Sequence, residues 1–181
     1  MFRFLPVLLA SLCCCCCCCM LAAEDKIAQA KFEKHTNKKG GFSVSFPGKP
    51  KTHIQKAPSQ AGELTIFMDM VEFGKGTIFI VSYNDYPEAL LQGDAQKHLE
   101  DVRDGINGPD GEVLKDDKWD FGPAKLPARQ VLIRKAGGVY LKGWIILKGN
   151  RLYQMVAVGD EKLVRSPEVE QKFFQSLSLS Q

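Results

Sequence analysis

All seven cysteines of the chain lie in one unbroken run, residues 13–19, and none occurs elsewhere. Disulfides therefore cannot join distant segments of the chain, because no partner cysteine exists outside the run. The run is not a zinc site either, since thiolate ligands need spacers between them to converge on one ion. The part of the chain that follows must therefore be stabilised by packing and hydrogen bonding alone.

The cysteines belong to an apolar stretch, residues 4–21, which follows Arg3 and precedes Ala22 and Ala23. A positive start, an apolar centre and small residues before a polar region are typical of a secretory signal peptide. We therefore expect residues 1–23 to be a signal peptide and the protein to be periplasmic or secreted. The stretch is longer than a usual h-region, so retention as a membrane anchor, through residues 4–21, is the first alternative. Lipid attachment to a cysteine is the second.

The remaining chain is long enough for one domain with its own core. We expect residues 24–31 to be a linker and residues 32–181 to be that domain. The whole chain has 24 basic and 21 acidic residues, a formal net charge of +3. Nucleic-acid binding needs a concentrated basic face, whereas the lysines between residues 38 and 56 are typical of a protected sheet edge. We expect no nucleic-acid partner.

Alternation of apolar and polar residues, interrupted by glycine and proline turns, predicts a mainly antiparallel β protein. The clearest example is residues 42–46, where phenylalanine and valine alternate with serine. The last three expected strands are joined by two tight glycine turns and form a meander. The expected strands cover residues 32–36, 42–46, 51–56, 64–70, 77–83, 112–121, 128–135, 139–147 and 151–158.

Two helices complete the pattern. Asp94 is the expected N-cap of a helix whose apolar residues recur at intervals of four, three and four. These residues are Ala95, Leu99, Val102 and Ile106. Ser166 caps the second helix, with Pro167 in its first turn. Its apolar residues, at intervals of four, are Val169, Phe173 and Leu177.

This order of hairpin, strands, helix, meander and terminal helix resembles small exported bacterial domains of the PsbP/DcrB-like type. The segments that carry the resemblance are residues 41–50, 82–87, 149–153 and 173–177. The resemblance covers about residues 30–181. It implies an α+β fold in which an antiparallel sheet of about six to eight strands is flanked by helices on both faces, a PsbP-like α/β/α sandwich. Relatives of this type serve as accessory or cell-envelope proteins, and no functional site of the photosynthetic members is matched here.

The sequence offers few residues for chemistry. His35, His53 and His98 are isolated and lack the spacing of a zinc helix. Neither a nucleophile elbow nor a phosphate or calcium loop occurs. We therefore expect no catalytic residue, no metal and no cofactor.

The most suggestive cluster is the run Tyr83, Asn84, Asp85 and Tyr86 at the expected end of a strand. Tyrosines beside a carboxylate there are candidates for contact with a partner or ligand, because their rings supply area and their hydroxyls direction. The simpler interpretation is that Asn84 and Asp85 shape a turn while the tyrosines pack at the end of the sheet.

Trp119 and Trp144 are a second candidate pair. The strand that carries Trp144 is partly apolar on both faces, which fits a sheet covered on both sides. We expect both tryptophans to pack in the core. The alternative is that one face of the strand lines a pocket for an apolar ligand.

Together these patterns predict an exported, non-catalytic binding or accessory module of the bacterial cell envelope. Its expected partner is another envelope protein, engaged through a sheet edge or the Tyr83–Tyr86 turn. The alternative is a carrier of an apolar small molecule or lipid in a pocket between sheet and helix. An enzyme ranks third, since no acid/base constellation is visible.

Overall fold

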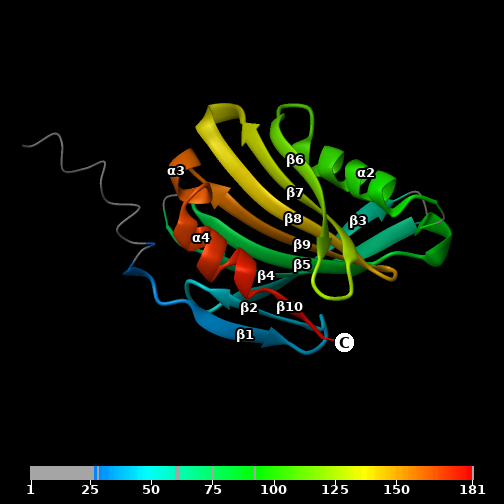
Figure 1. Ribbon diagram of the computed structural model, residues 1–181, viewed down its shortest axis with the longest axis horizontal. Helices are drawn as coiled ribbons and strands as arrows, with labels where there is room; N and C mark the ends of the chain where they lie inside the picture. The colour runs from blue at the N-terminus through cyan, green and yellow to red at the C-terminus, as the bar shows by residue number, and fades with distance from the viewer. Residues whose placement is uncertain (1–26, 28, 60–61, 75, 92, 181) are drawn as a thin grey trace, which may run out of the picture.

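Figure 1 shows a computed structural model of the protein, which describes residues 27, 29–59, 62–74, 76–91 and 93–180. The strands are β1 (Glu33–Asn37), β2 (Phe42–Phe46), β3 (Lys51–Ser59), β4 (Gly62–Glu72), β5 (Ile78–Asp85), β6 (Glu112–Phe121), β7 (Leu126–Lys135), β8 (Val139–Lys148), β9 (Arg151–Gly159) and β10 (Ser178–Leu179). The α-helices are α2 (Ala95–Asn107), α3 (Glu161–Val164) and α4 (Pro167–Lys172). Single 3-10 turns are η1 (Glu88–Leu91), η2 (Ala136–Gly138) and η3 (Phe174–Ser176).

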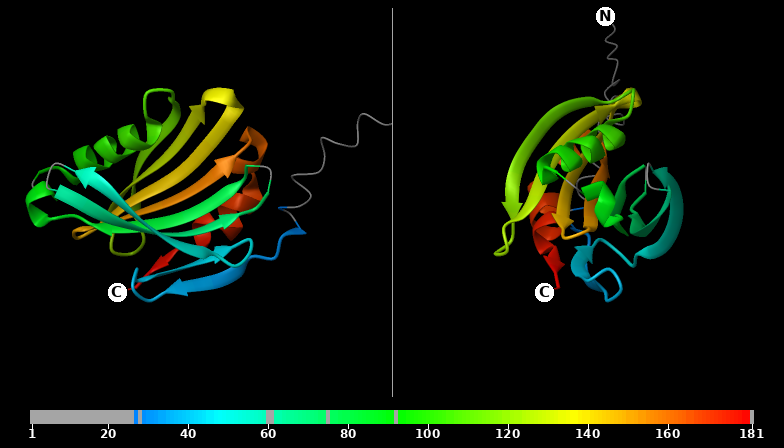
Figure 2. Two further views of the ribbon diagram at one scale, coloured as in Figure 1. Left: turned by 180° about the vertical axis from the view of Figure 1, so that it is seen from behind. Right: turned by 90° about the vertical axis from the view of Figure 1, so that its right-hand side faces the viewer.

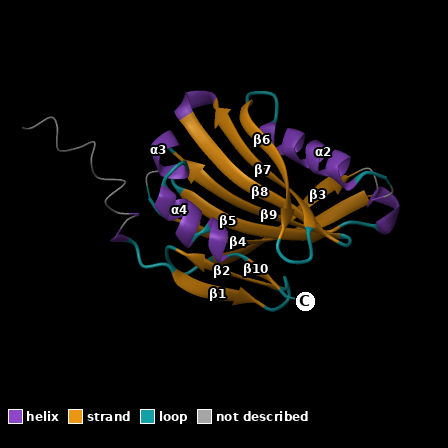
Figure 3. Ribbon diagram, viewed as in Figure 1, coloured by secondary structure: helices purple, strands orange, loops and turns teal. Residues whose placement is uncertain are grey.

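The strands form two antiparallel sheets. The large sheet has the order β3-β4-β5-β9-β8-β7-β6, and the small sheet has the order β1-β2-β10. Helix α2 lies on one face of the large sheet, which we call the helix face (Figure 2, left). The small sheet, α3 and α4 lie on the other, the hairpin face (Figure 3). The predicted α+β class, with helices on both faces of an antiparallel sheet, is confirmed, and the large sheet has seven strands.

The hairpin face is packed with aromatic side chains from distant parts of the chain. Phe46, Phe79 and Phe173 are fully buried. The ring centroid of Phe173 lies 5.0 Å from that of Phe79 and 5.5 Å from that of Phe46. Burial of each such side chain stabilises the fold by about 1.5–3 kcal/mol. This core therefore joins β2, β5 and the segment after α4.

The helix face is covered by α2, which begins as the sequence predicts. The Asp94 carboxylate accepts a hydrogen bond from the backbone N–H of Gln96 at 2.9 Å. Leu99 is fully buried against Val131, Ile133, Ile145, Leu147 and Leu152. The apolar stripe of α2 is therefore its contact with the sheet.

The second predicted helix, residues 167–177, is shorter in the structure. Its start is as expected, since the Ser166 hydroxyl accepts a hydrogen bond from the Val169 amide at 3.2 Å. Helix α4 nevertheless ends at Lys172, and the turn η3 follows.

Ser176 accounts for this early end. Its hydroxyl donates to the carbonyl of Phe173 at 2.6 Å and accepts from the backbone N–H of Ser45, on β2, at 2.8 Å. These bonds favour a tighter turn, which leads the chain into β10 beside β2. The partner Ser45 lies far away in the sequence, so the local pattern could not reveal it.

The predicted signal peptide, residues 1–23, lies outside the described residues. The predicted linker, residues 24–31, is described at Ile27 and from residue 29 onward. Ile27 is only 2% exposed and belongs to the core of the hairpin face. The linker prediction is therefore wrong at Ile27, because packing of this side chain extends the domain. None of the helices in the described residues is long and apolar enough to cross a membrane.

A buried carboxylate joins the small sheet to the large one. Asp69, on β4, is 1% exposed and accepts three side-chain hydrogen bonds. The donors are His35 Nε2 at 2.9 Å and Asn37 Nδ2 at 2.7 Å, both on β1, and Thr52 Oγ1 at 2.7 Å, on β3. A buried carboxylate is tolerated only where hydrogen bonds replace its water. We call these four residues the Asp69 clasp.

We expect Asp69→Ala to lower the free energy of unfolding by about 3 kcal/mol. Each hydrogen bond to a charged group contributes about 1.5–3 kcal/mol, and water that binds to the released donors offsets part of the total loss. Urea denaturation measures the change. Asp101→Ala is the matched control, since Asp101 is 61% exposed and pairs with Lys97 on α2; it should cost about 0.5 kcal/mol at most. Equal stability of the two variants would contradict the role of the clasp.

Candidate binding site

The predicted contact residues Tyr83–Tyr86 do not form one turn. Strand β5 continues to Asp85, because Asp85 still pairs with Arg151 of β9. Successive side chains of a strand point to opposite faces. Tyr83 and Asp85 therefore lie on the hairpin face, while Asn84 lies on the helix face and Tyr86 packs beside the core of that face. The expected turn was wrong, and the four residues form two separate pairs.

The hairpin-face pair belongs to a network centred on Arg151. Its guanidinium donates to both carboxylate oxygens of Asp85, at 2.6 and 2.7 Å, and to the backbone carbonyls of Lys39 and Gly40. The hydrogen bonds from Arg151 hold the pKa of Asp85 below its ordinary value. Burial raises the pKa of Tyr153, whose hydroxyl donates to the Gly40 carbonyl at 2.8 Å.

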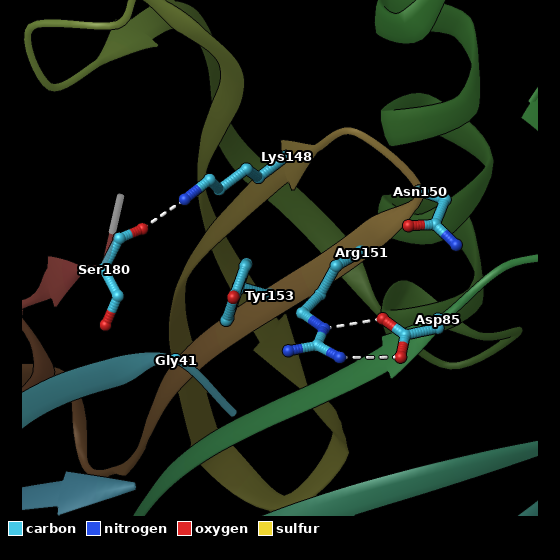
Figure 4. Close-up of a pocket in the computed structure, with 7 residues that line it drawn as sticks. All are labelled: Gly41, Asp85, Lys148, Asn150, Arg151, Tyr153 and Ser180. Carbon is cyan, nitrogen blue, oxygen red and sulfur yellow. Dashed lines mark hydrogen bonds and ion pairs between the residues drawn. The ribbon is translucent and has the colours of Figure 1, made fainter. Parts of the chain in front are cut away.

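A pocket of about 310 Å³ opens beside this network (Figure 4). Its lining residues are Gly41, Asp85, Lys148, Asn150, Arg151, Tyr153 and Ser180. Both of its cations already have partners: Arg151 binds Asp85, and Lys148 donates to the carbonyl of Ser180. The network thus fastens the β1–β2 turn and residues 178–180 to the sheet, which is a structural role.

A smaller pocket, of about 200 Å³, lies over β7 and β8. Three cations line it, and each has an acidic partner. The pairs are Lys115–Asp117, Lys142–Glu170 and Arg165–Glu161. Its charges are therefore also balanced within the chain.

The helix-face pair meets α2 at His98. The rings of Tyr86 and His98 are nearly perpendicular, at 88°, with centroids 4.5 Å apart. Burial lowers the pKa of His98 and raises the pKa of Tyr86, an increase that neighbouring Asn84 partly offsets. The Asn84 side chain is within hydrogen-bond reach of the Tyr86 hydroxyl, whereas His98 Nε2 is buried without a hydrogen bond to any described residue. Such unsatisfied buried atoms are rare in folded proteins.

Helix α2 covers only part of its face of the sheet. It packs mainly on β6, β7 and β8, and the strands β4 and β5 extend to its other side (Figure 2, left). Among the apolar side chains there that are only partly buried and belong to neither core cluster, six follow one another along β4, β5 and β9. They are Ile66, Met68 and Met70 of β4, Ile78 and Ile80 of β5, and Val158 of β9. We call these six residues the open strip.

The open strip is elongated and has one polar end. Met70 lies opposite Ile80, and Met68 lies opposite the buried Ser82. The adjoining helix-face residue of β5 is Asn84, which is 3% exposed. From Asn84 to Ile78 the strand advances about 20 Å, at ~3.3 Å per residue. An apolar surface of this kind that ends in a few polar groups has the composition of a ligand site.

A glycine leaves space on the neighbouring side of α2. Gly105 follows His98 by seven residues, so the two lie on the same side of the helix. A Cβ atom added at Gly105 would meet no atom within 4 Å. Glycine inside a helix costs about 1 kcal/mol relative to alanine, and no close contact requires it here. The helix therefore presents little bulk at this position.

The opposite side of α2 is fixed by a buried ion cluster that sequence reasoning missed. The Arg129 side chain, on β7, is 3% exposed and binds both carboxylate oxygens of Asp116, on β6, at 2.9 Å. It also reaches Glu100, on α2, at 3.1 Å. Arg103 of α2 binds Asp116 as well. The available signal was that Arg129 shares one face of the expected strand with Val131 and Ile133.

We expect Arg129→Met to lower the free energy of unfolding by about 3 kcal/mol, because removal of one partner of a buried pair leaves the other charges uncompensated. Chemical denaturation measures the loss. Arg134→Met, on the same strand, is the matched control, since its pair with Glu112 is half exposed and worth about 1 kcal/mol at most. A smaller loss for Arg129→Met than for the control would contradict the role of the cluster.

The other sequence candidates have structural positions. His35 belongs to the Asp69 clasp, and His53 is exposed on the edge strand β3. Trp144 is 7% exposed and lies 4.8 Å from Trp119, ring to ring, so core packing is confirmed for Trp144. In the described part of the chain, no group of three histidine, cysteine or acidic side chains is arranged to hold a metal ion.

Comparison with known proteins identifies the fold. No protein-family model matches the chain, and no curated protein sequence does. The solution structure of cyanobacterial PsbP (CyanoP) from Synechocystis sp. PCC 6803 matches with a TM-score of 0.57 and 13% identity, over 83% of this chain and 93% of that one. PA94 of Pseudomonas aeruginosa, of unknown function, matches with a TM-score of 0.40 and 14% identity, over 77% and 92%, which is too weak for argument. The predicted resemblance to PsbP is thus confirmed for the fold.

Proposed function

We propose that this chain, which has the PsbP fold, is an exported, non-catalytic binding module of the bacterial cell envelope. It would carry an apolar small molecule on the open strip. Export is supported by the signal-peptide pattern of residues 1–23. The absence of catalytic motifs in the sequence supports binding rather than chemistry.

The observation that carries the proposal is the part of the helix face that α2 does not cover. Partly exposed apolar residues there lie side by side in the β-sheet register, among them Met68 and Met70. Methionine is flexible and polarizable, and it is frequent on surfaces that accept varied apolar ligands. Gly105, on the His98 side of α2, is exposed, and an added Cβ there would meet no atom within 4 Å.

A second candidate is the sequence-derived expectation of a protein partner, now at the edge strand β3. Ile54 of this strand is 64% exposed, and the outer edge of β3 has no partner strand among the described residues. Such an edge can accept a strand from another protein. Lys51, Lys56 and Pro58, however, are residues that typically protect edges from pairing. The apolar ligand is therefore the first proposal.

We expect Gly105→Trp to weaken binding of phenylnaphthylamine, a neutral apolar fluorophore, because the indole would fill space on the side of α2 opposite the ion cluster, where β4 and β5 extend. Loss of contacts worth about 1.4 kcal/mol corresponds to tenfold weaker binding. Gly105→Ala is the matched control: it should retain binding and gain about 0.5–1 kcal/mol of stability.

Fluorescence titration measures the affinity of each variant, and thermal unfolding confirms that each is folded. If the purified protein does not bind the fluorophore, or if a folded Gly105→Trp variant binds it as well as Gly105→Ala does, the proposal fails.

A further inference from the structure

The smaller pocket, of about 200 Å³ over β7 and β8, is lined by cations that come from distant parts of the chain. The lining residues are Lys115, Gln130, Val131, Leu132, Lys142 and Arg165. In the described part of the chain, no acidic side chain is among them. A concave site lined by charges of one sign concentrates ligands of the opposite sign. The lining therefore favours an anion.

The strand register explains why two lysines face the same space. Lys115 of β6 and Lys142 of β8 both lie opposite Leu132 of β7, so the three residues form one row across the sheet. Side chains in such a row point to the same face. Neighbouring strands are about 4.8 Å apart, which places the two lysine Cα atoms about 10 Å from each other. A small anion above Leu132 would thus lie between two ammonium groups.

Two further donors complete the site. Arg165 follows α3, which lies on the hairpin face (Figure 3), and supplies the guanidinium from outside the sheet. Gln130 lies two residues before Leu132 on β7 and therefore on the same face. Its side-chain amide can donate a hydrogen bond. The site thus combines three cations and an amide around the buried Leu132.

The ion pairs of these cations leave them able to bind a ligand. Each cation has an acidic partner, but those acids lie outside the lining. The pairs of Lys115 and Arg165 are half exposed, and such pairs contribute little to stability. Lys142 is more covered and is positioned by Glu170 of α4. An ammonium has three donors and a guanidinium five, so a cation with one partner can bind an anion as well.

We propose that this pocket binds the phosphate group of a small soluble compound between Lys115, Lys142 and Arg165. A phosphate monoester carries about 1.5–2 negative charges near pH 7 and has three acceptor oxygens, which suits several cations better than a single carboxylate does. Lysine binds phosphate as a point charge, and arginine binds it through two parallel hydrogen bonds. The pocket is smaller than the ~300–1,000 Å³ of sites for drug-sized ligands, so the bound group is small.

This site is independent of the open strip and goes beyond the proposed function. Leu132 belongs to the core of the hairpin face, whereas the open strip lies on the helix face. The chemistry of the two ligands also differs, since one is apolar and the other is an anion. Each site can therefore be measured without the other.

The test is calorimetric titration of the protein with methyl phosphate and, separately, with acetate. The buffer contains no phosphate and about 0.15 M sodium chloride, which screens charges on the open surface. We expect saturable binding of one methyl phosphate per chain. Acetate should bind at least about tenfold more weakly, because it has a single charge and fewer acceptor oxygens.

Arg165→Met should weaken the binding of methyl phosphate about tenfold, as loss of one charge-assisted hydrogen bond would. Lys115→Met is a second variant with the same expected effect, since this side chain is also half exposed and its loss leaves the core intact. Arg134→Met is the matched control. Arg134 is as exposed as Arg165, pairs with an acid and lies on the same face of β7 as Gln130, but it does not line the pocket. This variant should bind methyl phosphate as the original protein does.

Three results would overturn the phosphate site: no saturable binding of methyl phosphate, equal binding of acetate, or equal affinities of the folded Arg165→Met and Arg134→Met variants. Thermal unfolding shows that each variant is folded. Failure here is distinguishable from failure of the proposed function, because the fluorophore titration reports on the open strip alone. If the fluorophore binds and methyl phosphate does not, only the phosphate site is lost.

Discussion

The buried Arg129 fixes the position of α2 and, with it, the shape of the helix face. Its guanidinium is 3% exposed and is shared between Asp116 of the sheet and Glu100 of the helix. Burial of these charges is costly, so the arrangement is stable only while every partner stays in place. An apolar stripe alone would let α2 slide across the sheet, since hydrophobic contact is non-directional. The ion cluster gives the contact a fixed position over β6–β8.

The two faces of the large sheet differ as a consequence. On the hairpin face, the small sheet, α3 and α4 bury a continuous aromatic core around Phe79 and Phe173. The Asp69 clasp and the Arg151 network then fasten the small sheet through hydrogen bonds to side chains and carbonyls. On the helix face, α2 is held to one side, and the open strip remains partly exposed. Packing is thus more complete on the hairpin face than on the helix face, where we propose the apolar ligand site.

The sequence predicted those features that depend on local pattern. The alternation in residues 42–46 predicted β2, and Asp94 predicted the start of α2. Both predictions were possible because strand periodicity and helix capping act within a few residues. The extension of β5 through Asp85, the early end of α4 and the strand β10 depend on partners far along the chain. The candidate run Tyr83–Tyr86 was divided between the faces for the same reason. Asp85 therefore binds Arg151 on one face, and Tyr86 packs against His98 on the other.

The open strip was not predicted as a site, although its residues were placed in strands. An apolar residue of a strand looks the same in the sequence whether its face is covered or not, and the coverage is decided by where α2 rests. Likewise, Gly105 within a helical pattern gave no sign that the space around it is empty in the fold. Arg129 was the available clue, since an arginine on the same strand face as Val131 and Ile133 needs buried partners.

The most direct test follows the methionine methyl groups of the isotope-labelled protein by nuclear magnetic resonance while phenylnaphthylamine is added. Met68 and Met70 lie in the open strip, whereas Met155 is 1% exposed in the core of the hairpin face. We expect the Met68 and Met70 signals to shift in proportion to bound ligand and the Met155 signal to stay in place. Shifts confined to Met155, or no shift at saturation, would contradict a ligand site on the helix face.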